Sequence, residues 1–331
     1  MKAIKFFAIT AMAAAMFTSC SNEDELSQSN YPSDNIIRIT AGVNNAKTRA
    51  EGAGVTQLEK SLSLTVVNKN ANTELANKYT HVNKVFSKDG NGVWNCSETL
   101  LWQNDTQPVD IVAFAPAPND KFNGVYTDGS IQPITYSVAD DQSTSPDNND
   151  LLYYYAKDFK PVDKLVDKKL NIEMNHAFCM IDIVVTLGTE FNKPEILKES
   201  PIVKVTLGGT KIEANVDVTK ATSVVTASGE ATTITTTKGT FDKAANAEAN
   251  AKSYFSCIAI PQEVAAKTFK VSLKTADKLY EWTSADPVVL QSGHRYTLEL
   301  SMGNNVVLLK GGSITAKPWT EITSDKPLET D

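Results

Sequence analysis

Basic residues are scarce in this sequence, arginine and histidine most of all. The 331-residue chain has 32 lysines and arginines against 39 aspartates and glutamates, and it has three histidines. Its arginines are Arg38, Arg49 and Arg295. The formal net charge is −7, and the basic residues form no cluster. These properties exclude the charge footprint of a nucleic-acid-binding protein and of a protein held on anionic lipid by charge.

Cysteine is also sparse, with four residues in the whole chain. Apart from Cys20 they are Cys96, Cys179 and Cys257, each in an apolar-rich stretch. An odd count without Cys-x-x-Cys spacing favours small buried side chains over a disulfide framework, although one pair could still form in an oxidising compartment. Because no histidine has a second His or Cys at ligand spacing, we expect neither a metal site nor a cofactor.

Sequence patterns of enzymes are missing as well. The chain has no Gly-x-Ser-x-Gly elbow and no P-loop. The acidic residues between Asp140 and Asp150 lack the twelve-residue spacing of a calcium loop, which favours a solvated turn. His176 begins a predicted strand, where a structural hydrogen bond is the expected role. The sequence therefore predicts a protein that is not an enzyme.

A single sustained apolar run stands at the start of the chain. Lys2 and Lys5 open it, residues 6–17 are apolar except for Thr10, and small residues lead to Cys20. About a dozen apolar residues are too few to span ~30 Å of hydrocarbon, so the run is typical of an export signal. Because it ends at Cys rather than at an Ala-x-Ala site, we expect a bacterial lipoprotein, cut before Cys20 and acylated there. An ordinary signal peptide with a chance cysteine is the alternative.

Alternation of apolar and polar residues recurs along the rest of the chain. The alternating runs begin at Leu62, Val109, Leu170, Ile181, Phe269 and Tyr296. One wet and one dry face is typical of antiparallel strands, and Gly-rich turn signals separate the runs. Many short strands between turns predict β-sandwich domains. Helical periodicity is weak, and its best instance, residues 243–252, is equally compatible with a loop.

The length of the chain favours two domains. A polar loop at residues 140–150 and a charged stretch at residues 157–169 precede the run that begins at Leu170, so we place the boundary near residue 165. The predicted parts are a signal peptide (1–19), an acidic tether with the first strand (20–49), an N-terminal sandwich (50–165) and a C-terminal sandwich (166–331).

The first predicted strand, residues 36–43, is the segment that bears most on function. Its inward face consists of Ile37, Ile39, Ala41 and Val43. Behind it, Arg49 lies in a polar loop, whereas Arg38 and Arg295 lie in predicted strands that a protease cannot easily draw out. An arginine-specific protease cutting between Arg49 and Ala50 would free the first strand and expose a hydrophobic groove with unpaired backbone edges. An ordinary surface arginine is the alternative.

Several short motifs follow one another in a fixed order. They are Thr48-Arg49-Ala50, Trp102 with Val112-Ala113-Phe114-Ala115-Pro116, Asp150-Leu151-Leu152-Tyr153, Met174-Asn175-His176-Ala177, Ile258-Ala259-Ile260-Pro261-Gln262, Gly293-His294-Arg295-Tyr296 and Ile314 to Trp319. Together with the signal that ends at Cys20, this set resembles the fimbrillin family, the type V pilins of Gram-negative anaerobes, nearly from end to end. Met174 departs from it where an aromatic residue is common, and Pro116 comes one residue early.

The resemblance implies an all-β protein of two tandem transthyretin-like antiparallel β-sandwich domains behind a lipoprotein signal peptide. It implies a surface-exposed subunit, lipid-anchored in the outer membrane at Cys20, which joins an adhesive fimbrium once an arginine-specific protease has removed the first strand. The expected partners are other pilin subunits of the same or another kind, joined by donor-strand exchange.

The donor strand is expected near the C-terminus, within residues 306–319. Its apolar positions are Val306, Leu308, Ile314 and Trp319. Burial of four inward apolar side chains contributes roughly 6–12 kcal/mol to the binding of such a strand. The entropy lost when the donor becomes ordered makes the net binding free energy smaller. The alternative function is a monomeric surface lipoprotein that binds glycans through exposed aromatic residues, for which the three tyrosines at 153–155 are candidates.

Overall fold

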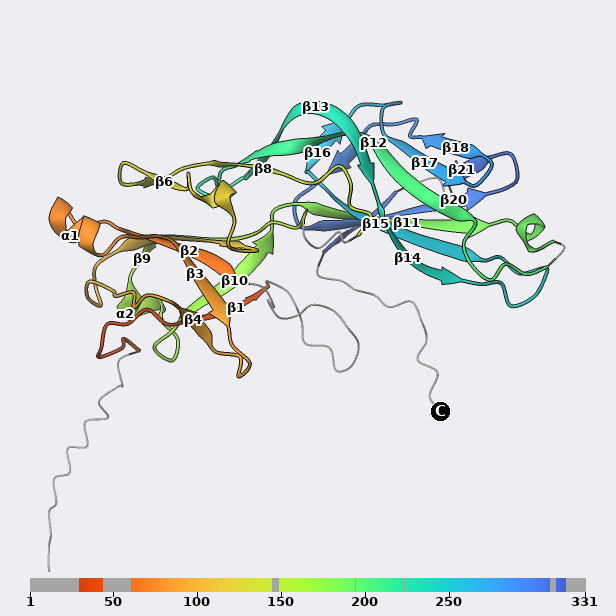
Figure 1. Ribbon diagram of the computed structural model, residues 1–331. Coiled ribbons are helices and arrows are strands. Elements are labelled where there is room, and N and C mark those ends of the chain that lie inside the picture. Colours follow the sequence, from red (N-terminus) through yellow and green to blue (C-terminus); the bar gives the residue numbers. More distant parts are fainter. Residues whose placement is uncertain are drawn as a thin grey trace, which may run out of the picture.

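The computed structural model describes residues 30–43, 61–144, 149–193, 195–222, 224–309 and 314–319. Within these ranges the chain is almost entirely β-structure, as the sequence predicts (Figure 1). The short helices are α1 (Thr73–Lys78), α2 (Pro161–Lys164) and the 3-10 turns η1 (Asp120–Phe122) and η3 (Thr189–Asn192). Among the residues described, no helix combines the length and apolar character needed to cross a bilayer. The expected lipidation site Cys20 and the expected cleavage site at Arg49 and Ala50 lie outside these ranges.

A seven-stranded sheet, here called the N-terminal sheet, forms one end of the molecule (Figure 1). Its strands are, in spatial order, β1 (Ile39–Val43), β10 (Leu170–His176), β9 (Leu152–Phe159), β5 (Val109–Ala115), β2 (Leu62–Asn68), β3 (His81–Lys88) and β4 (Trp94–Cys96). The pair β1–β10 is parallel, whereas the other neighbouring pairs are antiparallel.

Two further sheets form the other end. The first C-terminal sheet joins β14 (Thr237–Asp242), β15 (Lys252–Ala259), β11 (Cys179–Leu187), β20 (His294–Met302) and β21 (Val307–Leu309), with β22 (Thr315–Pro318) also on β20. The second C-terminal sheet joins β13 (Val225–Thr235), β12 (Ile202–Val216), β17 (Lys270–Thr275) and β18 (Leu279–Thr283), with β8 (Ile134–Ser137) also on β12. Two small pairs are β16 (Gln262–Val264) with β19 (Val288–Leu290), and β6 (Tyr126–Thr127) with β7 (Ser130–Ile131).

The sheets do not divide the chain near residue 165. The run from Leu170 is β10, which pairs with β1 and β9 in the N-terminal sheet, and the first C-terminal sheet is entered only at Cys179. Conversely, β8 precedes residue 165 but pairs with β12. An alternating pattern states that one face of a strand is buried, but it does not state which sheet covers that face.

Residues 243–251 form a loop between β14 and β15 rather than a helix. The Asn246 side chain accepts a hydrogen bond from the backbone N–H of Glu248, and Asn250 donates one to the carbonyl of Leu187. Asparagine side chains of this kind compete with helical backbone bonds, which explains why an alanine-rich segment stays irregular.

Two hydrophobic clusters lie on opposite faces of the N-terminal sheet. The smaller cluster gathers alternate residues of β2, β5 and β10 with the first segment of the chain. The larger cluster begins with the opposite face of β5 and fills the space between the C-terminal sheets. Within the larger cluster, a series of aromatic rings runs from β5 to the residue before β11. The centroid distances are 5.0 Å for Phe114–Phe122, 6.4 Å for Phe122–Tyr136 and 5.6 Å for Tyr136–Phe178.

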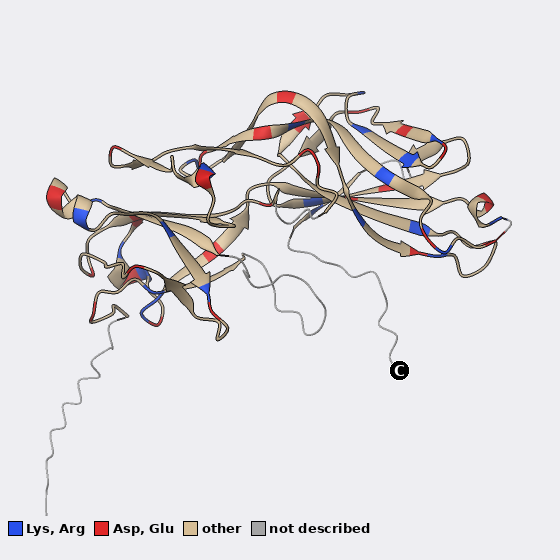
Figure 2. Ribbon diagram, in the orientation of Figure 1, with Lys and Arg blue, Asp and Glu red and all other residues tan. Residues whose placement is uncertain are grey.

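Charged residues of both signs are scattered along the strands and loops of the described chain (Figure 2). This distribution matches the sequence, in which acidic and basic residues are interspersed. The sheets are held together mainly by the burial of their apolar faces.

Candidate functional site

The first strand lies along one edge of the N-terminal sheet, parallel to β10 (Figure 1). The register runs from Ile39 opposite Leu170 to Val43 opposite Met174. Just before β1, the N–H of Ile37 donates to the Leu100 carbonyl at 2.9 Å. The edge of β1 that faces away from β10 has no strand partner in the described part of the chain. β1 is therefore paired on one side only, whereas the residues just before it also bond to residues 100–102.

Side chains of the first strand reach into the smaller cluster. Ile37 and Ile39 are 3% and 4% exposed, and Ala41 and Val43 are half-buried against the same cluster. Arg38 and Thr40 point the other way and are exposed. The segment thus fills an apolar cleft, and its removal would uncover the cluster.

β10 depends on β1 for most of its pairing. Its ladder with β9 contains Asn175 and His176, whereas residues 170–174 pair with β1. Ile172 and Met174 are fully buried. Withdrawal of β1 would leave these residues of β10 without a strand partner among those described, and such an edge with an apolar cleft is what an incoming strand binds.

Polar contacts mark the outer face of the β1–β10 pair. The Thr40 hydroxyl donates to Asn171 Oδ1 at 2.9 Å, and Asn171 Nδ2 donates to Glu173 Oε1 at 3.1 Å. Glu173 is exposed and stands opposite Gly42, which offers it no side chain. These contacts lie on the face opposite the apolar side chains and favour the observed register of the pair.

Arg38 is held just before β1 by a two-pronged ion pair. Its Nη1 and Nη2 donate to Asp34 Oδ1 and Oδ2 at 2.9 and 2.6 Å. The hydrogen bonds from Arg38, and then from the backbone N–H of Ile36, hold the pKa of Asp34 well below its ordinary value. Both side chains are 44% exposed, so solvent screens this ion pair and it adds little to the attachment of the chain at the sheet edge.

The C-terminal strands β21 and β22 pair antiparallel with β20 in the first C-terminal sheet. β21 pairs with residues 300–302 and β22 with residues 294–297. Of the residues assigned to the donor, Val306 and Leu308 are 50% and 59% exposed, while Ile314 and Trp319 are partly buried against the larger cluster. All four residues of β22 are exposed. This strand is therefore held mainly by its backbone bonds.

Trp319 fastens the end of this segment next to β10. Its ring stacks on His176 with centroids 3.8 Å apart and an interplanar angle of 10°, and its backbone N–H donates to the Gly293 carbonyl at 2.7 Å. His176 Nδ1 lies 2.7 Å from Asp150 Oδ2, so this histidine makes the structural contact expected from the sequence. Among the residues described, no three His, Cys, Asp or Glu side chains are grouped to hold a metal ion.

The three consecutive tyrosines take part in packing. Tyr153 and Tyr155 pack against the larger cluster, and Tyr154 packs against the smaller one. Burial raises the pKa of each hydroxyl above its ordinary value. Their alternating sides follow from the strand geometry of β9, and their rings cover both faces of the N-terminal sheet.

A model of the fimbrillin-like protein family matches residues 48–319. The chain belongs to this family. No protein with a curated description matches the sequence.

Solved structures share the fold of this fimbrillin-like chain. A candidate cell adhesion protein from Bacteroides uniformis has a TM-score of 0.55 at 14% identity, over 87% of this chain and 99% of that one. A second from Bacteroides ovatus has a TM-score of 0.56 at 18% identity, over 86% and 96%. A fimbrial protein from Bacteroides vulgatus has a TM-score of 0.53 at 14% identity, over 86% and 99%. At these identities the likeness concerns the fold.

The cysteines of the described fimbrillin-like chain are free thiols. Cys179 and Cys257 are buried, and the Cys179 Sγ donates to the Ala259 carbonyl at 3.2 Å. Burial raises the pKa of Cys257 to about 12 and raises that of Cys179 as well. Both side chains serve as small buried groups, whereas Cys96 in β4 is partly exposed.

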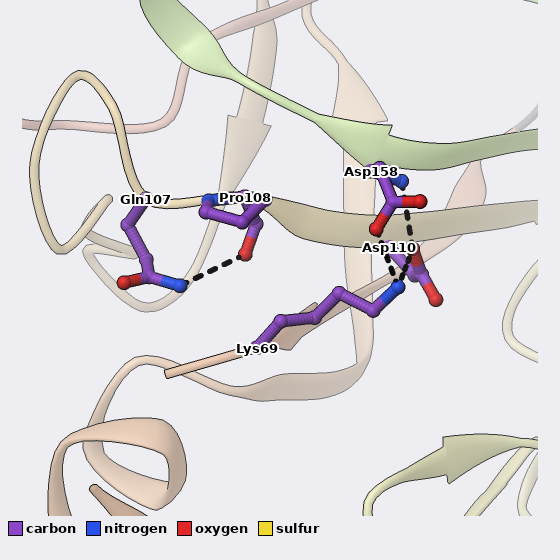
Figure 3. Close-up of polar contacts among 5 residues, drawn as sticks. All are labelled: Lys69, Gln107, Pro108, Asp110 and Asp158. Carbon is purple, nitrogen blue, oxygen red and sulfur yellow. Dashed lines mark hydrogen bonds and ion pairs between the residues drawn. The ribbon is translucent and has the colours of Figure 1, made fainter. Parts of the chain in front are cut away.

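Lys69, directly after β2, forms ion pairs with Asp110 of β5 and Asp158 of β9 in the N-terminal sheet (Figure 3). Its Nζ lies 2.6 Å from Asp158 Oδ1 and 3.0 Å from Asp110 Oδ1, and Asp110 Oδ1 also accepts the N–H of Asp158 at 2.8 Å. Asp158 has a φ of 50° in a β-bulge of β9. The hydrogen bond from Lys69 holds the pKa of Asp158 below its ordinary value of 3.8. The ion pair therefore stabilises the fold fully above pH 3.8, and this contribution is lost as the pH falls through the lowered pKa.

Replacing Asp110 is expected to weaken this end of the sheet. Asp110→Ala removes one of the two acceptors of Lys69 and the acceptor of the Asp158 N–H, which should lower the free energy of unfolding by about 1.5–3 kcal/mol. Asp110→Asn keeps a neutral acceptor and should lose less. Urea unfolding of both variants measures the difference, with Asp163→Ala in α2 as an exposed control. Equal stability of the Ala variant and the control would contradict the assigned role.

Sequence reasoning missed two features of the site. One is the Asn171–Glu173 pair on β10, because the partner of the first strand could not be identified. The other is the stack of Trp319 on His176, which joins residues far apart in the chain. The only available signal was that both residues belong to the motifs quoted above.

Proposed function

We propose that this chain is a fimbrial subunit that polymerises by donor-strand exchange after proteolytic removal of its first strand, and that the polymer mediates surface adhesion. Its family supports a fimbrial, cell-surface role. The fold shared with a fimbrial protein from Bacteroides vulgatus is in line with it. The single observation that carries the proposal is the place of the first segment, in which β1 is paired on one side and the side chains of Ile37 and Ile39 are buried.

The proposed life of the subunit begins with export and acylation at Cys20, which anchors it in the outer membrane. Each methylene group buried in the bilayer adds about 0.8 kcal/mol to the free energy of membrane binding, so two or three acyl chains suffice for a stable anchor. An arginine-specific protease then cuts between Arg49 and Ala50. The freed segment leaves, and another pilin subunit, of the same or another kind, fills the cleft.

The surroundings of the other arginines favour a cut at Arg49. Arg38 is bound to Asp34 directly before the paired strand β1. Arg295 lies inside β20 and forms an ion pair with Asp182 of β11. A protease requires an extended, accessible backbone, and paired strands withhold it.

Limited digestion of the mature chain tests this proposal. We expect an arginine-specific protease to give a new N-terminus at Ala50 by mass spectrometry, followed by ladders on gels run without boiling. The Arg49→Lys variant is the matched control and should give neither result. A cut chain that stays monomeric would overturn the proposal, and binding of polysaccharide by that monomer would support the glycan-binding alternative.

A further inference from the structure

The loop between β9 and β10 exposes apolar and basic side chains together. Residues 160–169 contain four lysines and two aspartates, and Val162 and Val166 of this loop are 37% and 59% exposed. Pro161 and Leu165 are buried and hold the loop against the sheet. Within the described part of the chain, none of the four lysines forms an ion pair. The loop thus presents valines beside unpaired positive charges.

The backbone of this loop has a defined shape. α2 begins it, and two backbone hydrogen bonds then join Val166 and Lys169 in both directions, at 3.0 and 2.9 Å. Asp167 and Lys168 between them have φ angles of 49° and 62°, as in the tight turn of a hairpin. The exposed side chains therefore project from an ordered backbone, and little entropy is lost when they bind a surface.

The loop lies beside the place where the described chain begins. The N–H of Val162 donates to the Asp105 carbonyl at 2.8 Å. Burial and the neighbouring charge of Asp105 raise the pKa of Tyr31 to about 12, so Tyr31 lies close to the same segment. Figure 1 shows α2 next to the first described residues. The chain that arrives from Cys20 therefore reaches the folded part of the molecule at this loop.

We propose that residues 160–169 lie against the lipid bilayer in the uncut, anchored chain, with Val162 and Val166 among the headgroups and the lysines beside anionic lipid. The inference rests on the proposed function, because it requires the anchor at Cys20, and it specifies which end of the subunit faces the membrane. From Cys20 to Asn30 the fully extended chain spans at most about 36 Å, which keeps this end within reach of the bilayer.

The anchor makes a weak contact sufficient. Two valines bury too little apolar surface to hold a protein on a membrane, and the chain as a whole is acidic. A short tether, however, keeps the loop near the bilayer at an effective concentration on the order of millimolar, so a contact of low intrinsic affinity forms. Lysine side chains lay their methylene groups along apolar surface and keep the ammonium group among polar headgroups. Lysines interspersed with valines suit this interface.

This orientation directs β1 away from the membrane. The N–H of Leu170, directly after the loop, donates to the Arg38 carbonyl at 2.8 Å, and β1 and β10 run parallel from there. The step from Ile39 to Val43 carries the chain about 13 Å away from the loop. The segment with the expected cleavage site at Arg49 therefore starts on the side away from the bilayer, where a protease in solution has access.

Chemical labelling of lysines on vesicles tests this orientation. The mature chain, with a histidine tag in place of residue 20, is bound to nickel-chelating lipid in vesicles of phosphatidylcholine and phosphatidylglycerol. A water-soluble acylating reagent then labels accessible amines, which mass spectrometry counts. We expect the labelling of Lys164 and Lys168 to fall about fivefold relative to the chain in solution. Lys238 in β14 and Lys274 in β17 are exposed and should be labelled equally in both samples.

Substitution of an exposed valine supplies the matched comparison. Val166→Asp should restore the labelling of Lys168 on vesicles, because a carboxylate among anionic headgroups opposes the contact. Val289→Asp in β19, at a valine that is 53% exposed, should leave the protection of Lys168 unchanged. Equal labelling of Lys168 on vesicles and in solution would overturn the proposal. Protection of Lys274 to the same extent would also overturn it, because the chain would then have no preferred face.

The tag separates this inference from the function on which it rests, because it supplies the attachment. Mass spectrometry of the native N-terminus shows whether Cys20 is acylated. If Cys20 carries no lipid but the tagged chain shows the protection described, the anchor proposal fails and the affinity of the loop for lipid stands. If Cys20 is acylated and the loop is not protected, the inferred surface alone fails.

Discussion

Deleting residues 306–331 is expected to abolish polymerisation of the cut chain while its N-terminal sheet stays folded. The deletion removes β21 and β22, which pair with β20, and with them the proposed donor. None of the residues described between 306 and 319 belongs to the smaller cluster. The acceptor cleft therefore keeps its packing when the donor is lost, and the expected loss of ladders is complete.

Gels run without boiling measure the ladders, and hydrogen exchange of β2 and β5 reports on the N-terminal sheet. A chain that ends at Trp319 is the matched control and should polymerise. Because Val307 is buried, the deletion also disturbs the larger cluster, so a second variant is needed. Ile314→Asp changes a partly buried residue of the resting chain but places a carboxylate in the cleft of Ile39. Continued polymerisation of either variant would contradict the donor assignment.

Phe122→Ala is expected to lower the free energy of unfolding by about 3–5 kcal/mol, the largest effect of a single substitution proposed here. Phe122 is fully buried in η1 between Phe114 of β5 and Tyr136 of β8. Its ring connects a strand of the N-terminal sheet with a strand of the second C-terminal sheet. Truncation leaves a cavity that neither sheet can close without moving the other.

Denaturant unfolding followed by circular dichroism checks this value. Val93→Ala, at a residue that is 55% exposed, serves as the control and should change stability by less than about 0.5 kcal/mol. A Phe122→Ala variant as stable as this control would show that the aromatic series does not connect the sheets. A loss of stability confined to β8, seen by hydrogen exchange, would limit its role to that strand.

Much of the fold was predictable because strand periodicity is a local property. The alternating runs from Leu62, Val109 and Leu170 are β2, β5 and β10. Those from Ile181 and Tyr296 fall in β11 and β20, with buried residues at every second position of β11. Burial of one face requires apolar residues at a period of two, so the pattern is visible without knowledge of the partner strand.

The candidate site was predictable in part for the same reason. The alternation of residues 36–43 places Ile37 and Ile39 on one face, and these two side chains lie in the smaller cluster. Three relations could not be predicted from the residues alone: the parallel pairing with β10, Glu173 opposite Gly42, and Lys317 opposite Arg295. Each of these relations joins segments more than a hundred residues apart or depends on the order of strands in a sheet.

The sequence alone determined that the chain is all-β, where the alternating strands lie, and to which family it belongs. It did not show that both faces of β2 and β5 are buried, where one exposed face was expected. The tertiary structure decided which sheet receives β10 and β8, which edge holds β1, and where the C-terminal strands rest. The physical reason is that burial and turn formation depend on neighbouring residues, whereas strand order depends on which distant surfaces fit together in the assembled core.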